Sequence, residues 1–143
     1  MNHVAFGSAT IPVFRLADAL NQRGWYVQVQ LDHRSSPANI HLCINPANLR
    51  WLEQLLADID HCVETVRDSA PSPLVASLKQ AVAQIDLTSV DDRTLQQMMT
   101  MAGLAPGVIP KVGAELNEVL DLLPPAARER VLTYFMNELF RAP

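Results

Sequence analysis

A proline-punctuated segment from Asp68 to Pro73 (DSAPSP) divides the sequence into two parts with different residue periodicity. Proline has no backbone N–H and fixes φ, so prolines mixed with serines predict an irregular connection. Before this segment, β-prone runs alternate with amphipathic stretches, whereas after it apolar residues recur only at helical spacing. A chain of 143 residues is long enough for one domain with a helical addition. We therefore expect an α/β unit over 1–68, a linker over 69–73 and a helical extension over 74–143.

The first part changes its apolar period several times, which predicts alternating strands and helices. In chain order, the expected elements are a strand at 3–8, a helix at 13–23, strands at 25–31 and 39–44, and a helix at 46–66. Gly24 stands where a helix ends in a left-handed cap, and Asn45-Pro46 is typical of a helix start. The order β-α-β-β-α predicts an α+β fold within the α/β class: a small, mostly antiparallel sheet with helices on one face.

The second part predicts short helices in series. Leu74, Leu78, Val82 and Ile85 mark one, and Ser89 to Asp92 resembles a capping box for the next, with Gly103 as its stop. Two more are expected, one ending before Pro124-Pro125 and a last one from there through Leu139. Since such helices cannot bury all their apolar stripes on one another, we expect them to pack on the α/β unit or on a partner.

Composition excludes several classes of function. Apolar residues make up 49% of the chain and charged residues 18%, with a net charge of −4 and no basic run, so we expect no nucleic-acid partner. Charge or proline interrupts every apolar stretch before the ~20 residues of a membrane helix, so no span is predicted. No secretory signal precedes the first strand, and Cys43 and Cys62 lie in apolar segments, which together favour a reducing, cytoplasmic location.

No motif for nucleophilic catalysis or phosphate binding occurs in the sequence. The chain has no Gly-x-Ser-x-Gly elbow and no cysteine–histidine signature, and its five glycines form neither a G-x-G-x-x-G fingerprint nor a P-loop. We therefore predict no catalytic residue in this chain, so any activity it serves requires other protein.

One pair of residues could in principle hold zinc. His41 and Cys43 at spacing i, i+2 lie on the same face of a strand, and His61 and Cys62 are more distant candidates. Structural zinc sites usually show C-x-x-C or H-x-x-x-H spacing, which is missing. We therefore predict no metal site, and we interpret His41 as a hydrogen-bonded histidine and both cysteines as small hydrophobes.

The other chemistry-bearing residues favour ordinary roles. Lys79 and Lys111 are the two lysines of the chain, and we expect both at the solvated surface, although a lysine in a pocket could bind a carbonyl cofactor. Arg15 and Arg34 could bind an anion but are interpreted as surface charges. The cluster Met98, Met99 and Met101 is expected to be a core stripe rather than a docking groove.

Several segments together resemble the C-terminal domain of sphingosine-1-phosphate lyases and related group II decarboxylases. They are Val4 to Ser8, Val13 to Asp18 (VFRLAD), Arg23-Gly24-Trp25, and Pro37 to Ile44 (PANIHLCI). Their order and spacing agree over about the first 67 residues, and the helical part resembles the tail of bacterial members more loosely.

The resemblance implies a pyridoxal-phosphate enzyme of the aspartate-aminotransferase fold. In that family a large domain supplies the cofactor lysine and most phosphate contacts, and the lysine follows a histidine, which neither Lys79 nor Lys111 does. No catalytic or cofactor-binding residue therefore carries over, and we expect no cofactor on this chain alone. His41 matches a family position but is interpreted as structural. The implied role is that of a C-terminal domain or fragment that packs on the large domain, helps to close its cleft and contributes to a dimer.

Two alternatives to this role remain open at the level of sequence. The chain could be a stand-alone module that binds a small molecule or a protein. It could also be a metal-dependent enzyme that uses His41 and Cys43, which would require stoichiometric zinc. The substrate of the parent enzyme would be chosen mainly by residues outside this chain.

Overall fold

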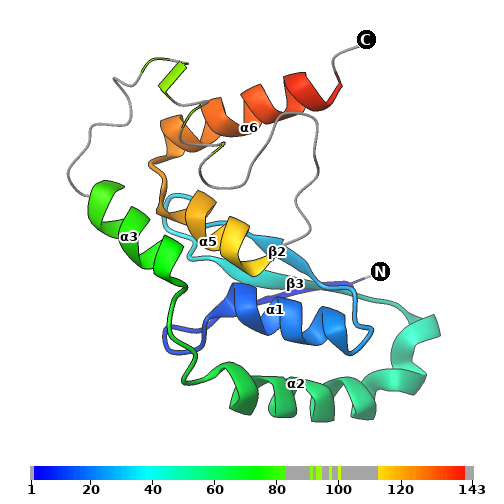
Figure 1. Ribbon diagram of the computed structural model, residues 1–143. Helices are drawn as coiled ribbons and strands as arrows, with labels where there is room; N and C mark the ends of the chain where they lie inside the picture. Colours follow the sequence, from blue (N-terminus) through cyan, green and yellow to red (C-terminus); the bar gives the residue numbers. More distant parts are fainter. Residues whose placement is uncertain are drawn as a thin grey trace. The chain divides into compact units, whose positions relative to one another are not determined.

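The computed structural model describes residues 2–82, 91, 93, 94, 97, 100 and 113–140. The chain forms two compact units, Met1–Ala70 and Pro71–Pro143, which are described separately below (Figure 1). The first combines a three-stranded antiparallel sheet with helices and the second is helical in its described part, so the predicted α+β class is confirmed.

The sheet of the first unit has the order β1-β3-β2, with β1 at Asn2–Phe6, β2 at Gln28–Gln30 and β3 at Asn39–Ile44. Both neighbours of β3 run antiparallel to it, as predicted. The expected strand 25–31 is shortened, because the β2–β3 ladder begins only at the pair Gln28–His41. Beyond His41 the carbonyl of Cys43 accepts a hydrogen bond from Asn48 Nδ2 at 3.1 Å, so a side chain contacts β3 where a longer β2 would pair.

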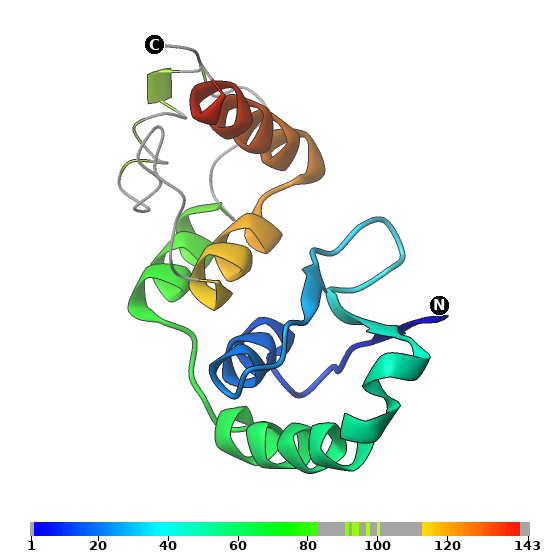
Figure 2. The ribbon, with the colours of Figure 1, turned by 90° about the vertical axis from the view of Figure 1, so that its right-hand side faces the viewer.

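The helices of the first unit lie on one side of the sheet (Figures 1 and 2). Helix α1 (Val13–Gln22) packs against β2 and β3, and α2 (Leu52–Val66) packs against the other side of α1. Each of the three layers contributes one almost completely buried side chain: Ile40 from the sheet, Leu20 from α1 and Cys62 from α2. Complete burial of one leucine or isoleucine side chain contributes about 1.5–3 kcal/mol, so this small core is the main source of stability for the unit.

A glycine cap ends α1. Gly24 has φ +91°, and the N–H groups of Gly24 and Trp25 donate to the carbonyls of Asn21 and Leu20, both at 3.0 Å. This is the Schellman arrangement, in which a left-handed residue satisfies carbonyls at the helix end. The cap turns the chain sharply, and Trp25 follows it directly.

The expected helix 46–66 begins as a 3₁₀ helix, η1 (Pro46–Trp51), before α2 takes over. Asn45 Oδ1 accepts from the N–H of Ala47 at 2.9 Å, and Asn48 Oδ1 accepts from the N–H of Asn45 at 3.0 Å. These reciprocal bonds satisfy N–H groups that have no partner inside the helix. Asn48 thus caps η1 and holds β3 with the same amide.

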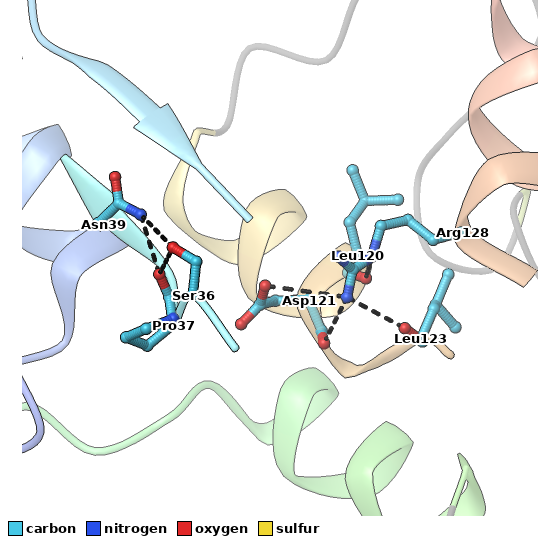
Figure 3. A network of polar contacts seen from close by, with 7 residues as sticks. All are labelled: Ser36, Pro37, Asn39, Leu120, Asp121, Leu123 and Arg128. Carbon is cyan, nitrogen blue, oxygen red and sulfur yellow. Dashed lines mark hydrogen bonds and ion pairs between the residues drawn. The ribbon is translucent and has the colours of Figure 1, made fainter. Parts of the chain in front are cut away.

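Asn39, the first residue of β3, bonds to the loop that precedes it: its Nδ2 donates to Pro37 O at 2.9 Å and to Ser36 Oγ at 3.5 Å (Figure 3). The turn itself is a tight reversal in which His33 and Ser36 pair and Arg34 has φ +55°. Asn39 is buried, and its Oδ1 has no hydrogen-bond partner in the described structure.

In the second unit, α3 (Pro73–Val82) packs against α5 (Ala114–Leu122), and α6 (Pro125–Leu139) follows α5. Arg128 of α6 is buried, and its guanidinium donates to the carbonyls of Leu120, Asp121 and Leu123 at 3.0–3.1 Å (Figure 3). The last carbonyls of a helix have no partner within it, so this arginine caps α5 from the following helix. Gly103, Lys111 and the three clustered methionines lie outside the described residues.

Candidate interaction site

A cavity of about 270 Å³ opens in the first unit where η1, the start of α2 and the end of β3 meet. Its walls are apolar side chains and two asparagines, and none of them is charged. The lining residues are Trp25, Tyr26, Val27, Leu42, Cys43, Ile44, Asn45, Asn48, Leu49, Trp51, Leu52 and Leu55. Both tryptophans of the chain are among them.

Trp25 is fixed in the cavity wall by a polar pair behind it. Its Nε1 donates to Asp58 Oδ2 at 2.7 Å, and Arg23 Nε donates to Asp58 Oδ1 at 2.6 Å. The hydrogen bond from Trp25, followed by that from Arg23, lowers the pKa of the Asp58 carboxyl below its usual value. The buried Asp58 therefore stays ionised and holds both residues that flank the Gly24 cap.

Among the lining residues that are exposed to solvent, four have large aromatic or aliphatic side chains: Tyr26, Leu49, Trp51 and Leu52. We call them the pocket face. Tyr26 is 91% exposed and Trp51 46%. Arg50 lies beside them, with its guanidinium carbon 5.0 Å from the centroid of the Trp51 ring, a cation–π distance. The pocket face is thus an aromatic and aliphatic surface with one cation at its rim.

The candidate zinc ligands are only partly brought together. His41 and Cys43 share a face of β3, opposite the face of Ile40, and Cys43 pairs with His3 across the ladder. His61 and Cys62 lie on α2, beyond α1. Among the described residues no group of three histidine, cysteine or acidic side chains could hold a metal ion. Cys62 is buried, which raises the pKa of its thiol, whereas Cys43 is exposed.

The remaining candidates also occupy separate places. Lys79 is exposed on α3, and Arg34 is exposed in the turn before β3. Arg15 of α1 donates to the carbonyl of Ala70 at 2.5 Å. Its guanidinium therefore holds the end of the first unit in place. The pocket itself was not predicted. The available signals were Tyr26, on the outer side of an alternating strand, and Trp51, which stands between Arg50 and Leu52.

The pocket does not fit pyridoxal phosphate. Among its lining residues there is no lysine to bond the aldehyde carbon and no cationic side chain to hold the phosphate. The absence of a catalytic residue at this site remains a prediction, and we derive no chemical step for this chain.

Comparison with known proteins places the chain beside pyridoxal-dependent enzymes. Residues 76–138 match the family model described as "Pyridoxal-dependent enzyme, C-terminal putative HTH domain". A sphingosine-1-phosphate lyase of Arabidopsis thaliana is 32% identical over 78 residues, and one of Oryza sativa subsp. japonica is 30% identical over 74. The matches cover 54% and 52% of this chain but only 13% of each lyase. No solved structure matches.

These similarities confirm the resemblance to the C-terminal region of pyridoxal-dependent enzymes that the sequence motifs suggested. The region that matches the lyases is a small part of their length. In the described part of the chain, no helix has the length and apolarity needed to cross a membrane.

Proposed function

We propose that this chain, which resembles the C-terminal region of pyridoxal-dependent enzymes, is the small domain of a lyase or decarboxylase. The observation that carries the proposal is the similarity itself, since a family model covers residues 76–138 and two lyases match just over half of the chain. The domain helps to close the active-site cleft and contributes to the dimer. Cleavage of a carbon–carbon or carboxyl bond of an amine substrate is performed by residues of the large domain.

The form of the first unit supports this role. A sheet with helices on one side buries a core of its own and leaves an apolar face around a cavity as surface for a second domain. The pocket fits a cofactor poorly, which is consistent with the cofactor being held elsewhere in the enzyme. The free, buried thiol of Cys62 is consistent with the reducing, cytoplasmic location that we propose.

The charge of the second unit argues for protein rather than nucleic acid as its partner. Helix-turn-helix domains that bind DNA need cations against phosphates, but acidic residues outnumber basic ones between residues 76 and 138. Arg128, one of those bases, is buried and donates to backbone carbonyls. We therefore infer that the helical unit contacts protein in the assembled enzyme.

Affinity purification of the tagged chain from its source organism tests the proposal. After borohydride reduction, which attaches bound pyridoxal phosphate covalently to its lysine, we expect the pyridoxyl label on a larger polypeptide that copurifies with the chain. The chain alone, mixed with pyridoxal phosphate and reduced, should carry no stoichiometric label. A label at Lys79 or Lys111 of the chain, or the lack of any labelled companion, would contradict the proposal.

A further inference from the structure

We propose that the pocket face is the docking site for a segment of the pyridoxal-phosphate-binding part of the enzyme, which inserts one large apolar side chain into the cavity and places a carboxylate against Arg50. This inference rests on the proposed function and deepens it by naming the surface and the chemistry of the partner. It depends on the composition, size, rigidity and charge of the site.

The composition of the site is that of an interface centre. Trp, Tyr and Arg are the residues in which binding energy concentrates at protein interfaces, and Trp51, Tyr26 and Arg50 lie together here. Leu49 and Leu52 extend the apolar surface, with 56% and 45% of their area exposed. Monomeric proteins seldom leave aromatic and aliphatic residues gathered in the open unless a partner covers them.

The size of the cavity favours a side chain over a whole ligand. Pockets for drug-sized molecules usually enclose about 300–1,000 Å³, and this one encloses about 270 Å³. A cavity of about 150 Å³ already accepts benzene. The site therefore has room for one large aromatic or branched aliphatic side chain.

The walls are held in place before any partner binds. Trp25 is fixed by Asp58, while the turn at Asn45 and the carbonyl of Cys43 are fixed by the amide of Asn48. A preformed pocket loses little entropy when it is filled, so one inserted side chain contributes more to affinity than it would at a mobile surface.

The charge of Arg50 indicates which kind of residue should stand next to the inserted side chain in the partner segment. The cavity lining is uncharged, and the guanidinium of Arg50 lies over Trp51 at the rim. A carboxylate next to the apolar anchor would pair with Arg50, which makes an apolar–acidic segment the complementary partner. A two-fold contact between copies of this face would instead bring two Arg50 side chains into one interface, which disfavours a second copy.

The source of the segment follows from the comparisons. Each matched lyase has most of its length outside the matched region, which covers 13% of it. If the chain serves such an enzyme, the remaining protein is the partner always present beside it. We therefore assign the segment to the cofactor-binding part.

Site-specific photocrosslinking in the source organism tests the assignment. The photoreactive residue p-benzoylphenylalanine replaces Tyr26 at the pocket face or, in a matched second protein, Phe140, which is 74% exposed beyond α6. After irradiation and borohydride reduction, the chain linked through position 26 should be found on a pyridoxyl-labelled larger polypeptide. Leu52→Asp should lower the yield at least tenfold, and Arg50→Glu severalfold.

Leu132→Asp serves as the matched control, because Leu132 is an exposed leucine on α6 and the pocket lies in the other unit. It should leave the yield at position 26 unchanged. Leu52 is 45% exposed, so an aspartate there meets solvent in the free chain, and loss of crosslinking by Leu52→Asp with unchanged circular dichroism would report docking rather than unfolding.

Three results would overturn the inference, and they separate it from the proposed function. Labelled polypeptide linked only through position 140 would leave the proposed function intact but place the contact elsewhere. Crosslinks from position 26 only to a second copy of the chain would make the face a self-association surface. If neither position captures a pyridoxyl-labelled polypeptide and none copurifies with the chain, the proposed function fails as well.

Discussion

At the scale of single residues, the carboxylate of Asp58 joins two parts of the first unit that are far apart in sequence. It accepts one hydrogen bond from Trp25, which lies 33 residues earlier in the sequence, and one from Arg23, which lies 35 residues earlier. Since these bonds favour the ionised form and lower the pKa of the carboxyl, its contribution to stability is present above the unfolded pKa of about 4 and disappears as the pH falls through the lower folded value.

Asp58→Asn should therefore reduce the free energy of unfolding at pH 7, and its difference from the wild type should shrink as the pH falls below about 4. Urea titrations over this pH range, followed by tryptophan fluorescence, measure the difference. Asp60→Asn, an exposed change on the same helix, provides the control. A difference that does not change with pH would show that the charge of Asp58 has no part in its contribution.

Gly24 is the second residue for which the structure predicts a definite cost. A Cβ at this position would meet no atom within 4 Å, but φ is +91°, a conformation that other residues rarely adopt. Gly24→Ala should thus destabilise the unit through backbone strain alone, by about 1–2 kcal/mol. Urea unfolding measures this loss, with Gln22→Ala at the exposed end of α1 as the control. Equal stability would mean that the cap can rearrange without cost.

At the scale of elements, Arg128 connects the end of α5 to α6 through three carbonyls. Arg128→Met keeps a long side chain but leaves these acceptors without the guanidinium, which should cost about 1–3 kcal/mol. Hydrogen exchange should accelerate in α5 and α6 while the fluorescence of Trp25 and Trp51, both in the first unit, stays unchanged. Arg130→Met on the same helix is the comparison, and equal protection in the two variants would show that the carbonyl contacts are dispensable.

Local signals in the sequence predicted the elements whose ends depend on local chemistry. Gly24 marked the end of α1, and prolines marked the starts of α3 and α6, because backbone conformation at these residues is restricted whatever surrounds them. The shortening of β2 was missed; beyond the end of its ladder the carbonyl of Cys43 is bonded by Asn48, a side chain from another element. The pocket and the Arg128 cap were missed for the same reason: both are assembled by tertiary packing, which residue spacing does not encode.

At the scale of the whole molecule, the division into Met1–Ala70 and Pro71–Pro143 predicts that the first unit folds without the second. Its buried residues Leu20, Ile40 and Cys62, the cap at Gly24 and the bonds of Asp58 all lie within the first 70 residues. Arg15, which anchors the carbonyl of Ala70, also stays inside this boundary. The contacts that fix the pocket are therefore complete within the unit.

A protein consisting of residues 1–70 should accordingly unfold cooperatively in urea, with the same tryptophan emission as the full chain, because both tryptophans report on the pocket. A small core leaves little margin, so ending the fragment at 66, before the contact between Arg15 and Ala70, should lower the unfolding midpoint measurably. If residues 1–70 show no cooperative transition, the first unit depends on the second for stability. The boundary between Ala70 and Pro71 would then separate two groups of contacts but not two independently folding units.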